Sequence, residues 1–372
     1  MIQFGNGKAL LQQIPRKSFN KLCTEWEMDY RVRSLSTWDF TVTHVMSQML
    51  KLPSIREIES VLDVPRSTFS DANKRRPAGF FHELCEMVLR ELKGQLGSRK
   101  SRRVLKKLFA IDSTECRVHG TMARFKGWRC KYNNPKESKA SVKLHAMWNL
   151  NDQNIEQYIL TPNRTHDKVA AGGFKFKAGA TYIFDRAYNE IAFWVKIIHA
   201  KAHFVSRLKV YKNTRRDIKK AKRLPKKKVG VLWDGEWKPC KQVRRAKQKL
   251  LKKIRFRRIV YRDPESKKTF EFITSDFRCS AQTIADIYRK RWSVELLFRW
   301  LKQNMNIRHL PSRNKNSVSI QLSIAVLIQL LLQIYRYKMK YKGSITECLK
   351  ELRNNLIVTG ITAKQVPIFS DS

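Results

Sequence analysis

Short apolar runs alternate with helical segments through the middle of the chain, and this order limits the possible folds more than any other feature. The segments follow one another as strands at 105–112, 140–150 and 155–162, a helix at 166–171, a strand at 181–185, a helix at 189–200 and a strand at 203–208. Three strands that can pair as a meander, followed by βα units, predict an α/β fold with a mixed sheet flanked by helices.

Two of these strand-like runs end in an aspartate. The residues before Asp112 and before Asp185 are apolar and β-prone. Buried parallel strands have this pattern where their carboxyl ends open onto a site, so each run could bring a carboxylate to the edge of the sheet. A single aspartate at such a place could instead cap the turn that follows, and Ser113 and Thr114 suit that alternative for Asp112.

A third carboxylate stands among basic and aromatic residues further along the chain. On an α-helix of about 100° per residue, Tyr288, Arg291, Glu295 and Lys302 would share one stripe, between roughly 300° and 0°. A separate apolar face, about 100° away, would consist of Val294, Leu297, Phe298 and Leu301.

The stripe has two interpretations. One is a solvated helix surface on which Arg291 and Glu295 form an ordinary i,i+4 pair. The other is a glutamate that binds a divalent metal ion while Arg291 and Lys302 hold a phosphate backbone beside it. The second interpretation needs more carboxylates, and Asp112 and Asp185 supply them.

These residues together resemble the signature of DDE-type transposases of bacterial insertion sequences, in particular the group named after insertion sequence four. That signature is Tyr, two residues, Arg, three residues, Glu, six residues, Lys. The chain meets it without a gap at Tyr288, Arg291, Glu295 and Lys302.

The other two acids of the family resemble Asp112 and Asp185. Arg186 follows the second acid and is expected to contact DNA, and many members carry Gly where this chain has Ala187, which indicates a tighter or shifted turn. The resemblance extends to Lys143-Leu144-His145 on the expected second strand. It spans most of the chain and is weakest after about residue 310.

The resemblance implies a ribonuclease-H-like catalytic core whose first and fourth strands are neighbours, which would bring Asp112 and Asp185 together. It also implies that these acids and Glu295 hold Mg²⁺ or Mn²⁺, because hard cations prefer oxygen ligands. Two such ions would activate water or a 3′-hydroxyl and stabilise the leaving oxygen of an in-line displacement. Arg291 and Lys302 would position the DNA strand. Tyr288 would assist by hydrogen bonding, not as a covalent nucleophile.

The expected function is therefore cleavage of double-stranded DNA at terminal inverted repeats, followed by strand transfer into target DNA. A homodimer is expected to join the two ends. Two other classes stay open: a metal-dependent nuclease of the same fold without strand transfer, and a catalytically silent DNA-binding protein. The intact acids argue against the silent protein.

The charge of the chain agrees with a DNA partner. Lys and Arg number 77 against 31 Asp and Glu, which gives a formal net charge of +46. Such a chain attracts polyanions, although its charge alone says nothing about catalysis.

A helix-turn-helix is predicted in the N-terminal region. Ser54 and Glu57 fit a capping box, an apolar side follows, and Pro65 enforces a turn before a second helix at 67–76. That helix would offer DNA a polar face of Arg66, Ser67, Thr68, Ser70, Asn73, Lys74 and Arg75. An ordinary helical hairpin is the alternative.

The expected domains are a helical N-terminal DNA-binding domain at 1–100, the first part of the catalytic core at 101–208, a β-rich basic insertion at 209–280, the rest of the core with the Glu-bearing helix at 281–345, and a C-terminal tail at 346–372. A linker is expected at 94–107. Strands are expected in the insertion at 229–237, 254–261 and 269–274.

Tryptophans of the insertion are a further candidate. In some members of the resembled family, such a residue holds an extruded base. Trp233 and Trp237 are the candidates here, and core packing is the alternative for both.

Nothing in the sequence predicts a membrane or zinc protein. The chain opens without a signal-peptide pattern, and its seven cysteines include no Cys-x-x-Cys pair, which suits reduced thiols in a bacterial cytoplasm near the nucleoid. The apolar run 323–334 is predicted to be a core helix. The surrounding helix at 318–335 could instead form a dimer interface, with burial inside the chain favoured.

Overall fold

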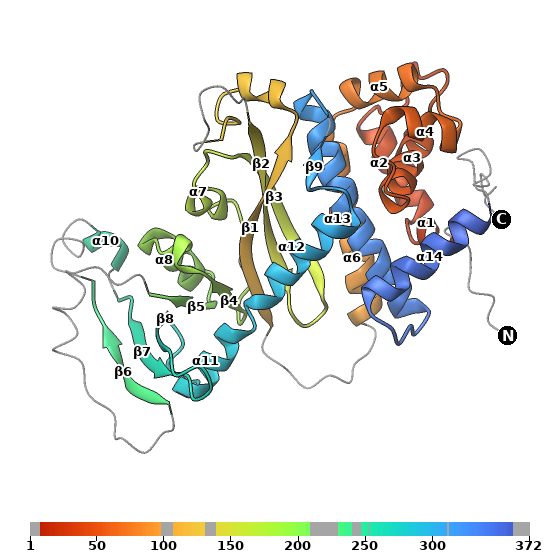
Figure 1. Ribbon diagram of the computed structural model, residues 1–372. Helices are drawn as coiled ribbons and strands as arrows, with labels where there is room; N and C mark the ends of the chain where they lie inside the picture. The colour runs from red at the N-terminus through yellow and green to blue at the C-terminus, as the bar shows by residue number, and fades with distance from the viewer. Residues whose placement is uncertain are drawn as a thin grey trace.

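The computed structural model describes residues 8–97, 107–130, 139–208, 230–239, 247–251, 253–310 and 312–359. These residues form a bundle of helices on one side, a central mixed sheet, and further strands that extend this sheet away from the bundle (Figure 1). The helices α8 (Ile191–His199), α10 (Gln248–Leu251) and α11 (Ala281–Arg289) flank these further strands. The sheet order is β3-β2-β1-β4-β5-β8-β7-β6, with β9 paired beside β1.

The first half of the sheet has the predicted order. Strands β1 (Leu108–Val118), β2 (Ala140–Asn149) and β3 (Asn154–Pro162) form an antiparallel meander, and β4 (Thr181–Phe184) and β5 (His203–Arg207) continue it in parallel beside β1. The short helix α7 (Asp167–Ala171) and the helix α8 (Ile191–His199) connect the later strands. The predicted neighbouring of the first and fourth strands is confirmed.

The sequence indicated that the first strand ends at Asp112, but β1 continues beyond this residue to Val118. Its pairing with β4 stops at Ile111 and Phe184, whereas its pairing with β2 continues to Val118. Asp112 therefore lies inside a strand, at the point where the neighbour on one side ends. The alternative of Asp112 as the cap of a following turn is wrong, because β2 keeps the backbone after it extended.

The basic insertion extends the same sheet. Strands β6 (Val231–Trp237), β7 (Phe256–Arg262) and β8 (Thr269–Thr274) are antiparallel, and β8 pairs with β5. The short helix α10 (Gln248–Leu251) lies between β6 and β7 in the chain. The predicted strands are confirmed, while 209–229 and 240–246 of the insertion lie outside the described residues.

The single helix predicted through Tyr288 and Lys302 is wrong. The structure has two helices, α11 (Ala281–Arg289) and α12 (Trp292–Asn304), separated at Lys290 and Arg291. Each helix packs into a different core, since α11 joins Ile259 and Phe272 of the extended strands and α12 joins the core around α13 (Lys315–Lys338). These two packing surfaces break the helix.

The helical side of the molecule has one continuous core. It contains α1 (Lys8–Leu11), α2 (Arg16–Glu25), α3 (Thr37–Met49), α4 (Ile55–Leu62), α5 (Arg66–Arg75), α6 (Ala78–Gly97), α12, α13 and α14 (Ile345–Thr359), packed on β1, β2 and β3. Helix α6 reaches Gly97, so it takes up the first residues of the expected linker, and α14 occupies part of the expected C-terminal tail. The division into domains stays a prediction.

Helix α13 is the centre of this core. It is long and apolar enough to cross a membrane, but 89% of its apolar window is buried inside the protein. Its Gln329 accepts a hydrogen bond from the Ile155 amide at 3.2 Å and donates to the Gln153 carbonyl at 2.9 Å. The prediction of a core helix, with burial in its own chain, is confirmed.

The predicted helix pair of the N-terminal region is present as α4 and α5. The Ser54 hydroxyl accepts from the Glu57 amide at 3.2 Å, as a capping residue does. Ile58 and Leu62 are buried, whereas Val61 is exposed because it lies about 100° around the helix from Leu62.

Candidate active site

The first and third predicted acids meet at one arginine. Helix α12 packs on β1, which places Glu295, in its first turn, near Asp112. Arg291 precedes this helix and donates from Nη1 to Asp112 Oδ2 at 3.1 Å, while its Nη2 pairs with Glu295 Oε1. The Arg291 side chain is only 17% exposed, so these are half-buried charges and not a solvated surface pair.

The second acid lies on the neighbouring strand. Asp185 directly follows β4, whose last residue pairs with Ile111 of β1. Its Oδ1 accepts from the Ala187 amide at 2.8 Å and caps the short 3₁₀ helix η2 (Arg186–Tyr188). The capping role weighed for such an aspartate is therefore present at Asp185, beside its place next to Asp112.

The electrostatics of Asp112 report how close the acids are. Burial raises the pKa of Asp112 to about 6, and the charges of Asp185 and Glu295 act in the same direction. The Ser113 amide, which donates at 2.8 Å, and Arg291 oppose this shift. Carboxylates that repel one another around a single arginine form a site that favours additional positive charge.

The donor set fits a divalent cation by its chemistry. Carboxylate oxygens are the ligands that Mg²⁺ and Mn²⁺ prefer. Within the described part of the chain, however, no three His, Cys, Asp or Glu side chains are grouped closely enough to hold a metal ion as they stand. Arg291 supplies positive charge between Asp112 and Glu295 instead.

A groove of about 870 Å³ opens beside these acids. Asp112, Glu295 and Lys302 line it together with Arg117, Arg299 and Arg308. Among the residues that the structure describes, none of these last four cations forms an ion pair. We call this surface the active-site groove. Its unpaired cations suit a phosphate backbone that runs past the acids.

Three of these cations, Arg117, Arg299 and Arg308, were not among the site residues predicted from the sequence. Arg299 had a signal, because at about 20° it lies on the same helical stripe as Glu295. Arg117 and Arg308 had none, since they come together only where β9 (His309–Leu310) pairs with Arg117 and Val118 of β1.

Comparison with known families decides the class of the protein. The family model of the transposase DDE domain matches residues 104–331, and that of a domain of unknown function matches residues 8–70. The chain belongs to the transposase DDE domain family. The predicted resemblance is confirmed, and the chain is an enzyme of cut-and-paste DNA transposition.

Known relatives agree with this assignment. A putative transposase of Sinorhizobium fredii (strain NBRC 101917 / NGR234) is 29% identical over 273 residues, which cover 72% of this chain and 70% of that protein. A probable transposase for an insertion sequence element of Geobacillus stearothermophilus is 29% identical over 258 residues, covering 69% of this chain and 63% of that protein.

A solved structure supports the fold. The cryo-EM structure of a piggyBac transposase synaptic complex with hairpin DNA superposes with a TM-score of 0.52 at 12% identity, over 96% of this chain and 81% of that one. The mixed sheet with flanking helices is thus the ribonuclease-H-like fold that the sequence predicted.

The remaining signature residues of this transposase lie around the acids. Tyr288 lies in the last turn of α11 with its ring 5.0 Å from that of Phe272, and the Arg291 guanidinium lies 5.9 Å from the Tyr288 ring. Burial raises the pKa of Tyr288, which keeps its hydroxyl protonated. Arg186 is exposed next to Asp185. DNA contact by Tyr288, Arg186 and Lys302 stays a prediction.

The two tryptophans of the insertion have different surroundings. Trp237 is 7% exposed and packs against Trp194 and Phe256, with ring centroids 6.3 and 6.0 Å away. This is the core packing that the sequence left as the alternative, and burial leaves no free ring face for an extruded base. Trp233 is half-buried with the Arg258 guanidinium 5.0 Å from its ring, and its contact with DNA stays a prediction.

The predicted DNA-binding residues of the N-terminal region lie away from the acids. Arg66, Lys74 and Arg75 are exposed on α5, on the helical side of the molecule (Figure 1). Asn73 of the same helix is buried, and its Oδ1 lies 2.8 Å from Nε2 of His44. Asn73 therefore joins two helices and is not on the exposed face.

The Lys143-Leu144-His145 segment forms a buried polar cluster with α7. Lys143 Nζ donates to Asp167 Oδ1 at 3.0 Å, and His145 Nδ1 lies 3.8 Å from the same oxygen. Burial lowers the pKa of His145 to about 4, so the imidazole is neutral near pH 7. This cluster fixes α7 to β2.

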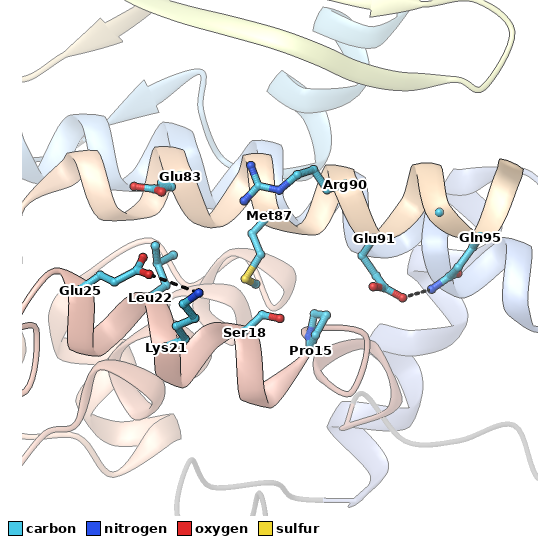
Figure 2. Close-up of a pocket in the computed structure, with 11 residues that line it drawn as sticks. Pro15, Ser18, Lys21, Leu22, Glu25, Glu83, Met87, Arg90, Glu91 and Gln95 are labelled. Atoms are coloured by element: carbon cyan, nitrogen blue, oxygen red, sulfur yellow. Dashed lines mark hydrogen bonds and ion pairs between the residues drawn. The ribbon is translucent and has the colours of Figure 1, made fainter.

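A separate cavity of about 590 Å³ lies between α2 and α6 (Figure 2). Its lining has both signs of charge, including Lys21, Glu25, Glu83, Arg90 and Glu91. None of the predicted catalytic or DNA-contacting residues lines it.

Proposed function

We propose that Asp112, Asp185 and Glu295 hold divalent metal ions with which this transposase cuts and joins DNA strands. The main support is that Asp112 lines one groove together with Glu295, and that the charges of Asp185 and Glu295 both help to raise its pKa. When bound, two such ions supply an activated water or 3′-hydroxyl and a stabilised leaving oxygen.

The residues around the acids would hold the DNA strand. Lys302, Arg299, Arg117 and Arg308 line the active-site groove and form no ion pair within the described part of the chain, which suits contacts with successive phosphates. Arg291 pairs with both Asp112 and Glu295 and offsets part of their charge. If a metal ion took its place, the Arg291 guanidinium would be available to a phosphate next to the acids.

The working state that we propose is a homodimer on two transposon ends in a bacterial cytoplasm, at the nucleoid. One chain offers a single set of three acids, whereas an element has two ends. The solved relative of similar fold was seen as a synaptic complex. Mg²⁺ is the expected ion, with Mn²⁺ as a substitute, because the ligands are carboxylates.

A strand-transfer assay tests this proposal. The protein, Mg²⁺, DNA with the repeats that flank its gene, and a supercoiled target are incubated beside the variants Asp185→Ala and Asp286→Ala. Asp286 is a partly exposed acid of α11 outside the groove and serves as the matched control. Joined products that disappear only in Asp185→Ala support the proposal.

Two other results would change the assignment. Cleavage without joining, lost in Asp185→Ala, would indicate a nuclease. Equal activity of wild type and Asp185→Ala would exclude Asp185 from the metal site.

A further inference from the structure

A second groove lies on the helical side of the molecule. Its volume is about 950 Å³, and it runs between helices α4 and α5 and the segment that joins α12 to α13. We call it the basic groove, after the side chains Arg56, Arg66, Lys74, Arg124 and Arg313 that line it. All five are exposed, and no Asp or Glu side chain is among the lining residues.

Most of this charge is uncompensated. Lys74 pairs with Asp71 at 3.1 Å, but both side chains are more than half exposed, and such surface pairs contribute little. Within the described residues, the four arginines of the basic groove form no ion pair. Cations collected at one surface without acids repel one another, so the groove favours a polyanionic occupant.

The floor of the basic groove is polar and uncharged. His44 lies there, buried, and burial lowers its pKa to about 4, so it adds no charge near pH 7. Gln48 donates to the Gln321 carbonyl at 2.7 Å, while Oε1 of both glutamines has no hydrogen-bond partner among the residues that the structure describes. Buried acceptors without partners are costly, and water that bridges them to a bound phosphate, which has no donor of its own, would relieve them.

The size of the groove limits the occupant. A volume of about 950 Å³ is that of a site for a small ligand, and a duplex cannot enter it. The edge of a duplex can enter the groove. One phosphate backbone would then lie between the arginines of α4 and α5 on one wall and Arg313 on the other.

The basic groove and the active-site groove share one segment of chain. Helix α12 carries Glu295 and Lys302 and ends at Asn304. The next residues line both surfaces, with Arg308 in the active-site groove and Met305, Asn306 and Leu310 in the basic groove. Strand β9, within this segment, is paired to β1, which fixes the two grooves relative to each other.

We propose that the basic groove binds the phosphate backbone of the same DNA duplex that is cut at Asp112, Asp185 and Glu295. One transposon end then spans both grooves, and its grip by α4 and α5 sets where the acids meet the strand. This inference deepens the proposed function and rests on it for the identity of the duplex.

The test measures DNA binding without metal, so it does not depend on cleavage. Fluorescence anisotropy gives the affinity for a labelled duplex of about three helical turns over a range of salt concentrations. Arg56→Ala/Arg313→Ala should lower the slope of log K against log salt by about 2, since each lost phosphate contact removes about 0.9. Both residues are exposed, and thermal melting verifies that the variant is folded.

The matched control removes two cations elsewhere. Lys21→Ala/Arg90→Ala changes the net charge equally, in the cavity between α2 and α6 (Figure 2). Its slope should stay within error of the wild type. A duplex of about one turn, placed at the cleavage site, should bind the wild type and Arg56→Ala/Arg313→Ala equally, because it cannot reach the basic groove.

Three results would overturn the proposal. These are an unchanged slope in Arg56→Ala/Arg313→Ala, an equal loss in the control, or a loss of self-association in sedimentation with unchanged DNA affinity, which would make the groove an interface between copies. If the slope falls in Arg56→Ala/Arg313→Ala but the wild type cleaves no DNA, DNA binding in the basic groove is supported and the proposed function is refuted. If the wild type cleaves DNA but the slope of the variant is unchanged, the proposed function is supported and DNA binding in the basic groove is refuted.

Discussion

Two arginines with little exposure to solvent, Arg257 and Arg291, bind carboxylates in this protein, and they do so in opposite ways. Arg257, on the extended strands, makes two bonds of 2.7 and 2.6 Å to Asp234 and donates to the carbonyls of Asp276 and Cys279. Arg291 divides its guanidinium between Asp112 and Glu295, with Asp185 nearby, and its own Nε has no hydrogen-bond partner among the described residues. The first pair is satisfied, while the second has more acid than base.

The difference teaches where to look for chemistry in a basic chain. A pair with matched charge and complete hydrogen bonds stabilises a fold. In a cluster with surplus carboxylate, the fold holds the acids together against their mutual repulsion. Such an arrangement indicates a site that binds a cation or a phosphate-bound metal ion. The two clusters should therefore respond differently to the same substitutions.

The largest expected difference is in catalysis. Asp112→Asn should reduce strand transfer by about a thousand-fold or more, since a metal ligand contributes several kcal/mol to the transition state. Asp234→Asn should keep activity close to the wild type at temperatures where it stays folded. Gel assays of the initial rate of strand transfer measure both effects. Equal losses in the two variants would contradict the catalytic difference between the Asp112 cluster and the Asp234–Arg257 pair.

Stability should show the reverse order. Asp234→Ala leaves Arg257 buried without its partner and should cost about 3–5 kcal/mol. Asp112→Ala should cost less than about 1 kcal/mol, because its carboxylate is already disfavoured by burial and like charge. Urea denaturation gives both values. The double variant Asp234→Leu/Arg257→Met is the control and should recover most of the loss.

The pH dependence of stability offers a sharper probe of the surplus charge. Asp112 has a folded pKa of about 6, above its usual value of 3.8. The folded state therefore binds the proton more tightly, so the free energy of unfolding falls as pH rises from about 4 to about 6. Asp112→Asn should remove this decrease, about 2 kcal/mol, from urea titrations without metal. A parallel pH profile in both proteins would contradict the shift.

The smallest effect concerns the competition between Arg291 and metal ions. Arg291→Ala frees Asp112 and Glu295, so Mn²⁺ should bind about tenfold more tightly in the absence of DNA, which corresponds to about 1.4 kcal/mol. Titration calorimetry measures this. Arg299→Ala, one turn after Glu295, is the control and should leave metal affinity unchanged. Weaker binding in Arg291→Ala would mean that the arginine organises the acids instead of competing for them.

The sequence predicted the elements that depend on local pattern. The order of strands from β1 to β5 followed from apolar runs, and the three acids followed from their places in those runs and in a signature. The pair of Asp234 and Arg257 could not be predicted, because it depends on the register of β6 with β7. Trp237 likewise lies in the core only because β6 packs its inner face against Trp194.

The helix break was hidden for a physical reason. Lys290 and Arg291 both have right-handed helical backbone, and neither Gly nor Pro marks the place. Only the presence of two cores, one for each helix, separates α11 from α12. The apolar periodicity of a single segment does not show whether its two halves pack into one hydrophobic core or into two.

This break gives the two halves of the signature different tolerance to a change in length. Helix α12 is seated by its own apolar face, so one residue inserted at Lys290 would leave Glu295 where it is and move only Tyr288 away from Arg291. One residue inserted after Glu295 would turn Lys302 by about 100° out of the active-site groove. The spacing from Tyr288 to Arg291 therefore sets the length of the connection between two helices. The spacing from Glu295 to Lys302 sets the angle between two side chains around one helix.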